Sequence, residues 1–90
     1  MKLIEWNNEK NEILKNERNS SFETISEKIL SRDIIDIFKH PNQTKYPNQK
    51  VFIIEVNHYI YYVPFVEDED RIFLKTIIPS RKATKKYLGK

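Results

Sequence analysis

Apolar residues recur with a helical spacing in the first third of this chain and with a strand spacing in most of the remainder. The helical spacing is clearest between residues 20 and 31, where four apolar side chains fall on one face: Phe22, Ile25, Ile29 and Leu30. Ser20 and Glu23 stand three residues apart at its start, which is the spacing of a capping box and predicts Ser20 as the N-cap. We expect an amphipathic helix that ends near Ser31 and buries one face.

A weaker helical pattern precedes it, over Glu9–Arg18. The stretch contains good helix formers, but its apolar stripe holds only three residues: Trp6, Ile13 and Leu14. The side-chain oxygen of Asn7 or Asn8 can accept a hydrogen bond in the first turn, and Asn19 suits the left-handed conformation that ends many helices. This helix is expected on the surface, with one narrow buried edge.

Five segments are rich in β-branched and aromatic residues and are expected to be strands: Lys2–Trp6, Asp33–Phe38, Lys50–Val56, Tyr59–Val66 and Ile72–Ile78. Asn57 and His58 predict a tight turn between the third and the fourth. Pro64 has no N–H for the sheet ladder, so we expect a bulge or an edge position there. The stretch Asn42–Gln49 is longer than a simple hairpin needs, which makes it a candidate functional loop.

The last expected strand alternates between two faces. One face carries four of its residues: Ile72, Leu74, Thr76 and Ile78. The other face, which we assign to the exposed side of the sheet, carries the remaining three: Phe73, Lys75 and Ile77. Pro79 then breaks the strand, and a short basic helix is expected behind it.

The expected elements have the order β-α-α-β-β-β-β-α, and consecutive strands at hairpin spacing form an antiparallel meander. The two early helices must cover one face of this sheet, because their apolar stripes need burial. The sequence therefore predicts a single α+β domain over residues 1–90, with an antiparallel sheet, two N-terminal helices on one face and a short basic C-terminal helix.

The composition of the 90 residues excludes several classes of site. The chain has no cysteine and only one glycine, so a disulfide, a thiolate site and a glycine-rich nucleotide loop are all ruled out. No apolar run approaches the roughly 20 residues that span a membrane, and the N-terminus turns polar after Trp6, unlike a signal peptide. We expect a cytoplasmic protein with no membrane partner.

The net charge is only +3, but its distribution is strongly polarised. The last twenty residues hold seven cations and no acid: Arg71, Lys75, Arg81, Lys82, Lys85, Lys86 and Lys90. Acidic residues concentrate instead in Glu5–Glu27 and in Glu67–Asp70. A basic end of this kind suits a phosphate-bearing partner such as RNA. The simpler alternative is a basic helix that is exposed to solvent and binds nothing.

Other polar and aromatic residues carry weaker signals. Glu67–Asp70 lacks the spaced ligands of a calcium loop and fits a solvated hairpin tip better than a metal site. His40 and His58 lie at the ends of expected elements, where an acid or base is accessible, although a surface role is commoner. Three aromatic residues share one face of the fourth strand, opposite Tyr62, and suit either core packing or stacking on RNA: Tyr59, Tyr61 and Phe65.

Two stretches resemble the BrnT-type toxins of the RelE/ParE superfamily. The opening of those toxins matches this chain at five positions: Glu5, Trp6, Lys10, Ser21 and Phe22. Their Arg-Lys-Ala-Thr-Lys-Lys run matches residues 81–86. This chain differs from the family at three positions: it has Arg18 where the family has His, Asn19 where the family has Gly, and Tyr87 where the family has Glu. A bulge, expected at Pro79, would align Lys75 with the basic residue of the family's last strand.

The resemblance implies a RelE-like fold and an endoribonuclease that cleaves mRNA or other RNA without metal or cofactor, inhibiting translation and growth. It also implies a cognate antitoxin that neutralises the toxin. The antitoxin would carry a ribbon-helix-helix DNA-binding domain, so that the complex reaches operator DNA only through the antitoxin.

In metal-free RNA cleavage the 2′-hydroxyl attacks the adjacent phosphate, and cations stabilise the charge that develops on the phosphoryl oxygens. We assign Lys75 and Arg81 to the scissile phosphate, and either Tyr87 or His58 to proton transfer. Four further residues are assigned to RNA binding: Lys82, Lys85, Lys86 and Tyr61. The alternative is a non-catalytic RNA- or protein-binding module, in which the same cations only hold phosphate.

Overall fold

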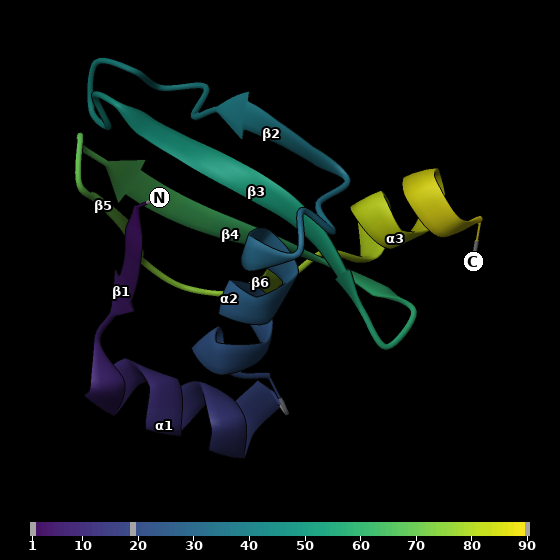
Figure 1. The fold of residues 1–90 in the computed structure, drawn as a ribbon. Helices are drawn as coiled ribbons and strands as arrows, with labels where there is room; N and C mark the ends of the chain where they lie inside the picture. Colours follow the sequence, from purple (N-terminus) through teal and green to yellow (C-terminus); the bar gives the residue numbers. More distant parts are fainter. Residues whose placement is uncertain (1, 19, 90) are drawn as a thin grey trace.

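The computed structural model describes residues 2–18 and 20–89, and it confirms the α+β class (Figure 1). The helices are α1 (Asn8–Arg18), α2 (Phe22–Leu30) and α3 (Arg81–Leu88). The strands are β1 (Leu3–Trp6), β2 (Asp36–Lys39), β3 (Gln49–Val56), β4 (Tyr59–Glu67), β5 (Arg71–Leu74) and β6 (Ile78–Pro79). No helix among these residues is long and apolar enough to cross a membrane.

The strands form one sheet in the order β1-β5-β4-β3-β2, and β6 pairs with β4 beyond the end of β5. From β2 to β5 the neighbours are antiparallel, as the meander requires. β1 instead lies parallel to β5, with Ile4 opposite Ile72. The expectation of an entirely antiparallel sheet is therefore wrong at this edge, where a long connection through both early helices allows a parallel pair.

Two apolar clusters lie on opposite faces of the sheet. Helices α1 and α2 cover one face, below the sheet in Figure 1, and bury nine apolar residues there: Leu14, Phe22, Ile25, Phe52, Ile54, Val63, Phe65, Leu74 and Ile77. Helix α3 covers part of the other face, where Ala83 packs with Ile53 and Ile60. The predicted two-helix cover is confirmed, and much of the second face stays open beside α3.

The connection from β5 to β6 contains one residue more than the stretch of β4 that it faces. Leu74 pairs with Phe65 and Ile78 pairs with Tyr62, so the three residues 75–77 face only two residues of β4. This bulge shifts the alternation of side chains by one position. As a result Ile77 is fully buried with Leu74. Three residues instead line a groove on the open face: Lys75, Thr76 and Ile78.

The predicted two-face pattern of the last strand is therefore wrong beyond Leu74. Thr76 and Ile78 do not share the face of Leu74, and Ile77 does not share the exposed side of Lys75. The cause is the bulge, because each residue after it points to the face opposite to that of a regular strand. The exposed position expected for Lys75 is confirmed.

Pro64 lies directly across from this bulge. Strand β4 stays regular there, with Pro64 opposite Val51, and the carbonyl of Pro64 accepts the N–H of Lys75 at 2.8 Å. The N–H and the C=O of one residue point to the same side of an antiparallel strand. Proline lacks the N–H, and at Pro64 this group would have pointed towards the bulge, where the regular ladder of hydrogen bonds is interrupted. The expected bulge is thus present in the chain facing Pro64, at residues 75–77 and not at Pro79.

Asparagine side chains organise the two early helices. Asn7, the first of the two predicted caps, accepts the N–H of Lys10 at 3.0 Å. Asn11 is buried in α1, donates to Glu23 Oε1 at 2.7 Å and accepts the N–H of Phe22 at 2.8 Å. These bonds fasten the start of α2 to α1, and the hydrogen bond from Asn11 is the main cause that lowers the pKa of Glu23.

The N-cap of α2 is Ser21, one residue after the predicted Ser20. Ser21 Oγ accepts the N–H of Thr24 at 3.2 Å, whereas Ser20 Oγ is buried with no hydrogen-bond partner among the described residues. With Ser21 as the N-cap, the third residue after it is Thr24 and not Glu23, so no capping box forms, and Glu23 Oε1 accepts from Asn11 instead. The predicted stop at Asn19 lies outside the described residues.

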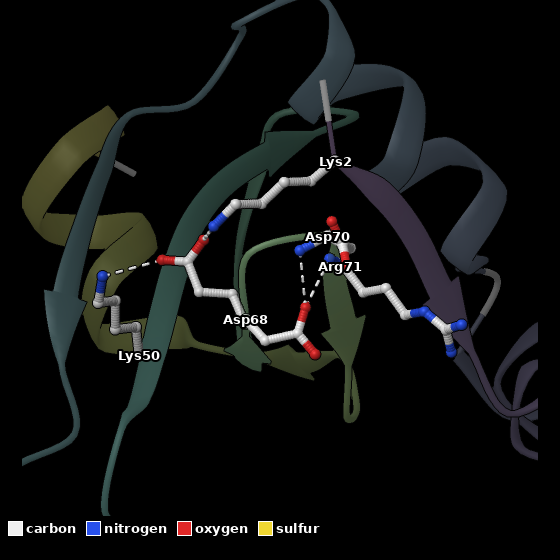
Figure 2. A network of polar contacts seen from close by, with 6 residues as sticks. Lys2, Lys50, Asp68, Asp70 and Arg71 are labelled. Carbon is white, nitrogen blue, oxygen red and sulfur yellow. Dashed lines mark hydrogen bonds and ion pairs between the residues drawn. The ribbon is translucent and has the colours of Figure 1, made fainter.

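A carboxylate cluster joins three strands at the far end of the sheet (Figure 2). Glu67, about a quarter exposed, accepts from Lys2 Nζ at 2.8 Å and from Lys50 Nζ at 2.9 Å. Asp68 Oδ1 accepts hydrogen bonds from the backbone N–H groups of Asp70 and Arg71, and these bonds close the turn between β4 and β5. The hydrogen bonds from Lys2 and Lys50 lower the pKa of Glu67, and the two backbone amides lower the pKa of Asp68.

The change of cap is testable with two alanine substitutions. Ser21→Ala should lower the free energy of unfolding by about 1 kcal/mol, the usual cost of losing a serine N-cap. Ser20→Ala should be neutral or slightly stabilising, because it removes a buried hydroxyl without a partner. Urea unfolding followed by circular dichroism measures both. If Ser20→Ala lowers the free energy of unfolding more than Ser21→Ala does, Ser20 and not Ser21 is the N-cap.

The Glu67 cluster predicts a pH-dependent contribution to stability. A carboxylate whose pKa is lowered by folding stabilises the fold above its unfolded value, near 4.3, and loses this contribution as the pH falls through the folded value. Glu67→Gln should therefore cost about 1 kcal/mol at pH 7, and the difference from wild type should shrink towards pH 3. Glu69→Gln, at an exposed neighbour, is the control. Equal effects of the two substitutions in urea unfolding would contradict the ion-pair interpretation.

Candidate functional site

A groove of about 510 Å³ lies on the open sheet face beside α3. Six of the residues that line it are apolar or aromatic: Phe38, Pro41, Val51, Tyr62, Pro64 and Ile78. Five others bring polar atoms: His40, Tyr46, Gln49, Lys75 and Thr76. The bulge between β5 and β6 delivers Lys75 and Thr76, and the loop after β2 delivers His40 and Tyr46. This arrangement combines a flat apolar surface with a few polar groups.

The imidazole of His40 is held in one orientation. The backbone N–H of Asn42 donates to Nδ1 at 3.0 Å, and the ring packs against Tyr46 with centroids 4.3 Å apart. Because a backbone N–H can only donate, Nδ1 is an unprotonated acceptor while this bond is made, and the ring proton is then on Nε2. In this state His40 offers a ligand a fixed N–H donor.

The loop between β2 and β3 is tied together by its own amides. Gln43 Nε2 donates to the carbonyls of His40 at 2.6 Å and Gln49 at 3.3 Å, and Asn42 Oδ1 accepts the N–H of Lys45 at 3.0 Å. The predicted loop is confirmed, except that Gln49 already begins β3. Because the loop is closed on itself, the three residues that it contributes to the groove, His40, Pro41 and Tyr46, have defined positions.

Five cations on this side of the molecule have no acidic partner among the described residues: Lys75, Arg81, Lys82, Lys85 and Lys86. All five are exposed, whereas Lys2, Lys28 and Lys50 form ion pairs elsewhere. Arg81 follows Ile78 by three residues, so their Cα atoms lie no more than about 11 Å apart. The unpaired charge therefore begins next to the groove and continues along α3.

The buried residues of α3 explain why its cations face outward. Ser80 Oγ caps the helix by accepting the N–H of Ala83 at 3.1 Å. Thr84 Oγ1 accepts the N–H of Ile60 at 2.9 Å and donates to the carbonyl of Ser80 at 2.7 Å. Ala83 and Thr84 are buried against β4, so their role in the Arg-Lys-Ala-Thr-Lys-Lys run is structural. The remaining positions of the run, Arg81, Lys82, Lys85 and Lys86, are exposed.

Of the eight predicted site residues, Lys75 is the one that lines the groove. Five lie on α3 and do not line it: Arg81, Lys82, Lys85, Lys86 and Tyr87. The other two lie elsewhere on the sheet. His58 is at the tip of the β3–β4 hairpin with a positive φ of 64°, its side chain 79% exposed and 3.7 Å from Glu55. That tip is beyond Val56, which is itself about 17 Å along β3 from Val51. Tyr61 points to the face covered by α1 and α2 and packs on the main core. Their predicted roles in proton transfer and RNA binding therefore gain no support from their positions.

Tyr87 and Lys86 stay together on α3, with Lys86 Nζ 5.4 Å from the centre of the Tyr87 ring. Apart from Lys75, the residues that line the groove are ones that the sequence did not assign to the site, among them Gln49, Tyr62 and His40. For Tyr62 a signal existed in the sequence, because strand alternation places it on the face opposite Tyr61. In the structure its ring meets Phe38 edge to face, with centroids 5.7 Å apart. For Gln49 and His40 no local signal of a shared groove existed, since their neighbourhood depends on how the loop closes.

The arrangement can hold a chain that carries both negative charge and flat apolar groups. Unpaired cations suit phosphates, and the aromatic and proline surfaces of the groove suit unstacked bases. Within residues 2–18 and 20–89, no cluster of three or more His, Asp or Glu is placed to bind a metal ion. Comparison with protein-family models, with curated proteins and with solved structures finds no match to this chain.

Proposed function

We propose that this protein is the toxin of a toxin–antitoxin pair, an endoribonuclease that cleaves single-stranded RNA in the cytoplasm without a metal ion. The observation that carries the proposal is the row of unpaired cations beside an aromatic groove on the open face. Cations neutralise phosphates, and unstacked bases need flat apolar surfaces. A folded protein with only an incidental basic helix would not require the two to be adjacent.

Two structural details support the resemblance to BrnT-type toxins. The bulge at residues 75–77 supplies the one-residue shift that Lys75 needs in order to align with the family's basic strand residue. The run at residues 81–86 forms one helix whose Ala83 and Thr84 anchor it while its cations stay exposed. Both details favour a shared architecture.

In the proposed reaction the 2′-oxygen of RNA bonds to the adjacent phosphorus and the bond from phosphorus to the 5′-oxygen breaks, leaving a cyclic phosphate and a 5′-hydroxyl. Lys75 and Arg81 stabilise the charge on the phosphoryl oxygens. Lys82, Lys85 and Lys86 hold flanking phosphates. One proton leaves the 2′-hydroxyl for solvent, and one reaches the 5′-oxygen. Tyr87 is the proton donor that we favour, because it shares α3 with Arg81 and His58 does not.

The same surface suits the proposed antitoxin. An acidic segment of that partner would be complementary to the unpaired cations of α3 and would block the groove, which is how it would neutralise the toxin. Contact with operator DNA would come through the ribbon-helix-helix domain of the antitoxin.

A second candidate function is a non-catalytic module that binds RNA or a protein segment. The apolar character of much of the groove favours it, because such a surface also suits a polypeptide. This alternative predicts binding without any loss of RNA.

Induction of the protein in bacterial cells tests the proposal. Wild type should arrest growth and deplete RNA, whereas Lys75→Ala and Arg81→Ala should each lower the cleavage rate of the purified protein by about a hundredfold or more. His58→Ala, at the distant hairpin tip, is the control and should keep full activity. Circular dichroism confirms that each variant is folded. Arrest that survives both cation substitutions would refute the site, and the absence of arrest in wild type would favour the binding module.

The salt dependence of RNA binding separates phosphate contacts from other effects. For single-stranded RNA, the logarithm of the association constant falls linearly with the logarithm of the salt concentration. Each lost phosphate contact should make this slope shallower by about 0.7. Lys82→Ala should show this change in fluorescence anisotropy with a labelled single-stranded RNA. Lys28→Ala is the matched control, because Lys28 pairs with Asp33 on the opposite side of the sheet. Identical slopes in wild type and Lys82→Ala would remove Lys82 from the interface.

A further inference from the structure

Gln49 is a largely buried residue whose carboxamide has no hydrogen-bond partner in the part of the chain that the structure describes. The residue is only 8% exposed. Its backbone is occupied, since its N–H donates to Tyr46 and its carbonyl accepts the N–H of His40 at 2.9 Å. Its side chain, however, makes no hydrogen bond with any of the described residues. The one fully buried side-chain atom without a partner among the described residues is Ser20 Oγ, so the amide atoms of Gln49 reach the solvent of the groove that the residue lines. A ligand in the groove could replace that water with hydrogen bonds of its own.

The alternation of β3 places this carboxamide on the groove side. Gln49 and Val51 are two residues apart on a regular strand, so their side chains share a face. Val51 lies opposite Pro64, and both residues line the groove, as does Gln49. A ligand in the groove would therefore meet an amide that the fold leaves without a partner.

The rest of the groove matches a nucleobase. Tyr62 and Phe38 meet edge to face and present aromatic surface, and the groove volume of about 510 Å³ is within the range of small-ligand sites. Unstacked RNA bases are bound in this way, with a flat apolar surface beneath the ring and an amide at its edge. A carboxamide can donate and accept at once, as each base edge requires.

Two groups beside Gln49 add donors. The Nε2–H of His40 is available because Asn42 occupies Nδ1, and Lys75 carries an ammonium group with no acidic partner among the described residues. Cations next to the base position suit the phosphate of the same nucleotide and favour RNA over a polypeptide segment as the occupant.

We infer that the groove is a base-recognition subsite of the proposed ribonuclease, in which one unstacked nucleobase lies against Tyr62 and Gln49 hydrogen-bonds its edge. This inference rests on the proposed function, because it names the part of the RNA that the groove binds. Gln49 is then a specificity-determining residue, while Lys75 contacts phosphate and carries no sequence information.

A panel of single-stranded RNAs that differ at one nucleotide tests this role, with both binding and cleavage measured. Wild type should prefer one base by about tenfold, the discrimination expected of a good amide-to-base contact. Gln49→Leu, which keeps the approximate size without hydrogen-bonding atoms, should reduce that preference to below about threefold. Lys75→Ala should instead weaken the binding of every RNA in the panel by the same factor.

Gln49→Glu provides a second variant of nearly the same shape, which accepts but no longer donates when ionised. It should change the preferred base even if Gln49→Leu folds poorly. If wild type binds and cleaves RNA with no preference, or if the preference survives in both variants, the role of Gln49 is overturned and the ribonuclease proposal stands. If wild type neither binds nor cleaves any RNA of the panel, the ribonuclease proposal falls and the base subsite falls with it.

Discussion

The single extra residue between β5 and β6 is the constraint on which the candidate site depends. Burial of Leu74 and Ile77 in the main core requires both side chains to point towards α1 and α2, although they are three residues apart. A regular strand cannot do this, since positions of odd separation point to opposite faces. The bulge resolves the conflict and leaves Lys75 and Thr76 on the open face. The cation of the groove thus owes its position to the packing of two apolar neighbours.

Strand β4 connects this constraint to the basic helix. Opposite the bulge it carries Pro64, whose missing N–H is harmless only where the ladder is interrupted. Further along, the amide of Ile60 is paired with Thr84 of α3 instead of with another strand. The hydrogen bonds of one strand therefore fix both the bulge and the helix that comes after it. A mutation in this strand that disturbed the ladder would displace Lys75 and the α3 cations together.

Local patterns predict much of the fold and little of the site. Apolar periodicity predicts both early helices and the central strands, because each element buries one face. It misses the parallel pairing of β1 with β5, which depends on residues about seventy positions apart. It also places the cap of α2 at Ser20 and not at Ser21, because it does not include the hydrogen bonds of Asn11 to Glu23 and to the N–H of Phe22, which come from another helix. His58 and Tyr61 are candidates because of their chemistry, whereas Gln49 is distinguished only by being buried and unpaired after folding.

Some cations of this protein form ion pairs in the fold, and others do not. Ion pairs are formed at the end of the sheet where Lys2 and Lys50 share Glu67, and on α2 where Lys28 meets Asp33. The cations of the bulge and α3 receive no such partner, so within the described residues no acidic side chain offsets their mutual repulsion. A polyanion relieves that repulsion when it binds, and so does an acidic protein segment. The two proposed partners, RNA and antitoxin, would therefore compete for one surface, and neutralisation by direct occlusion needs no second site.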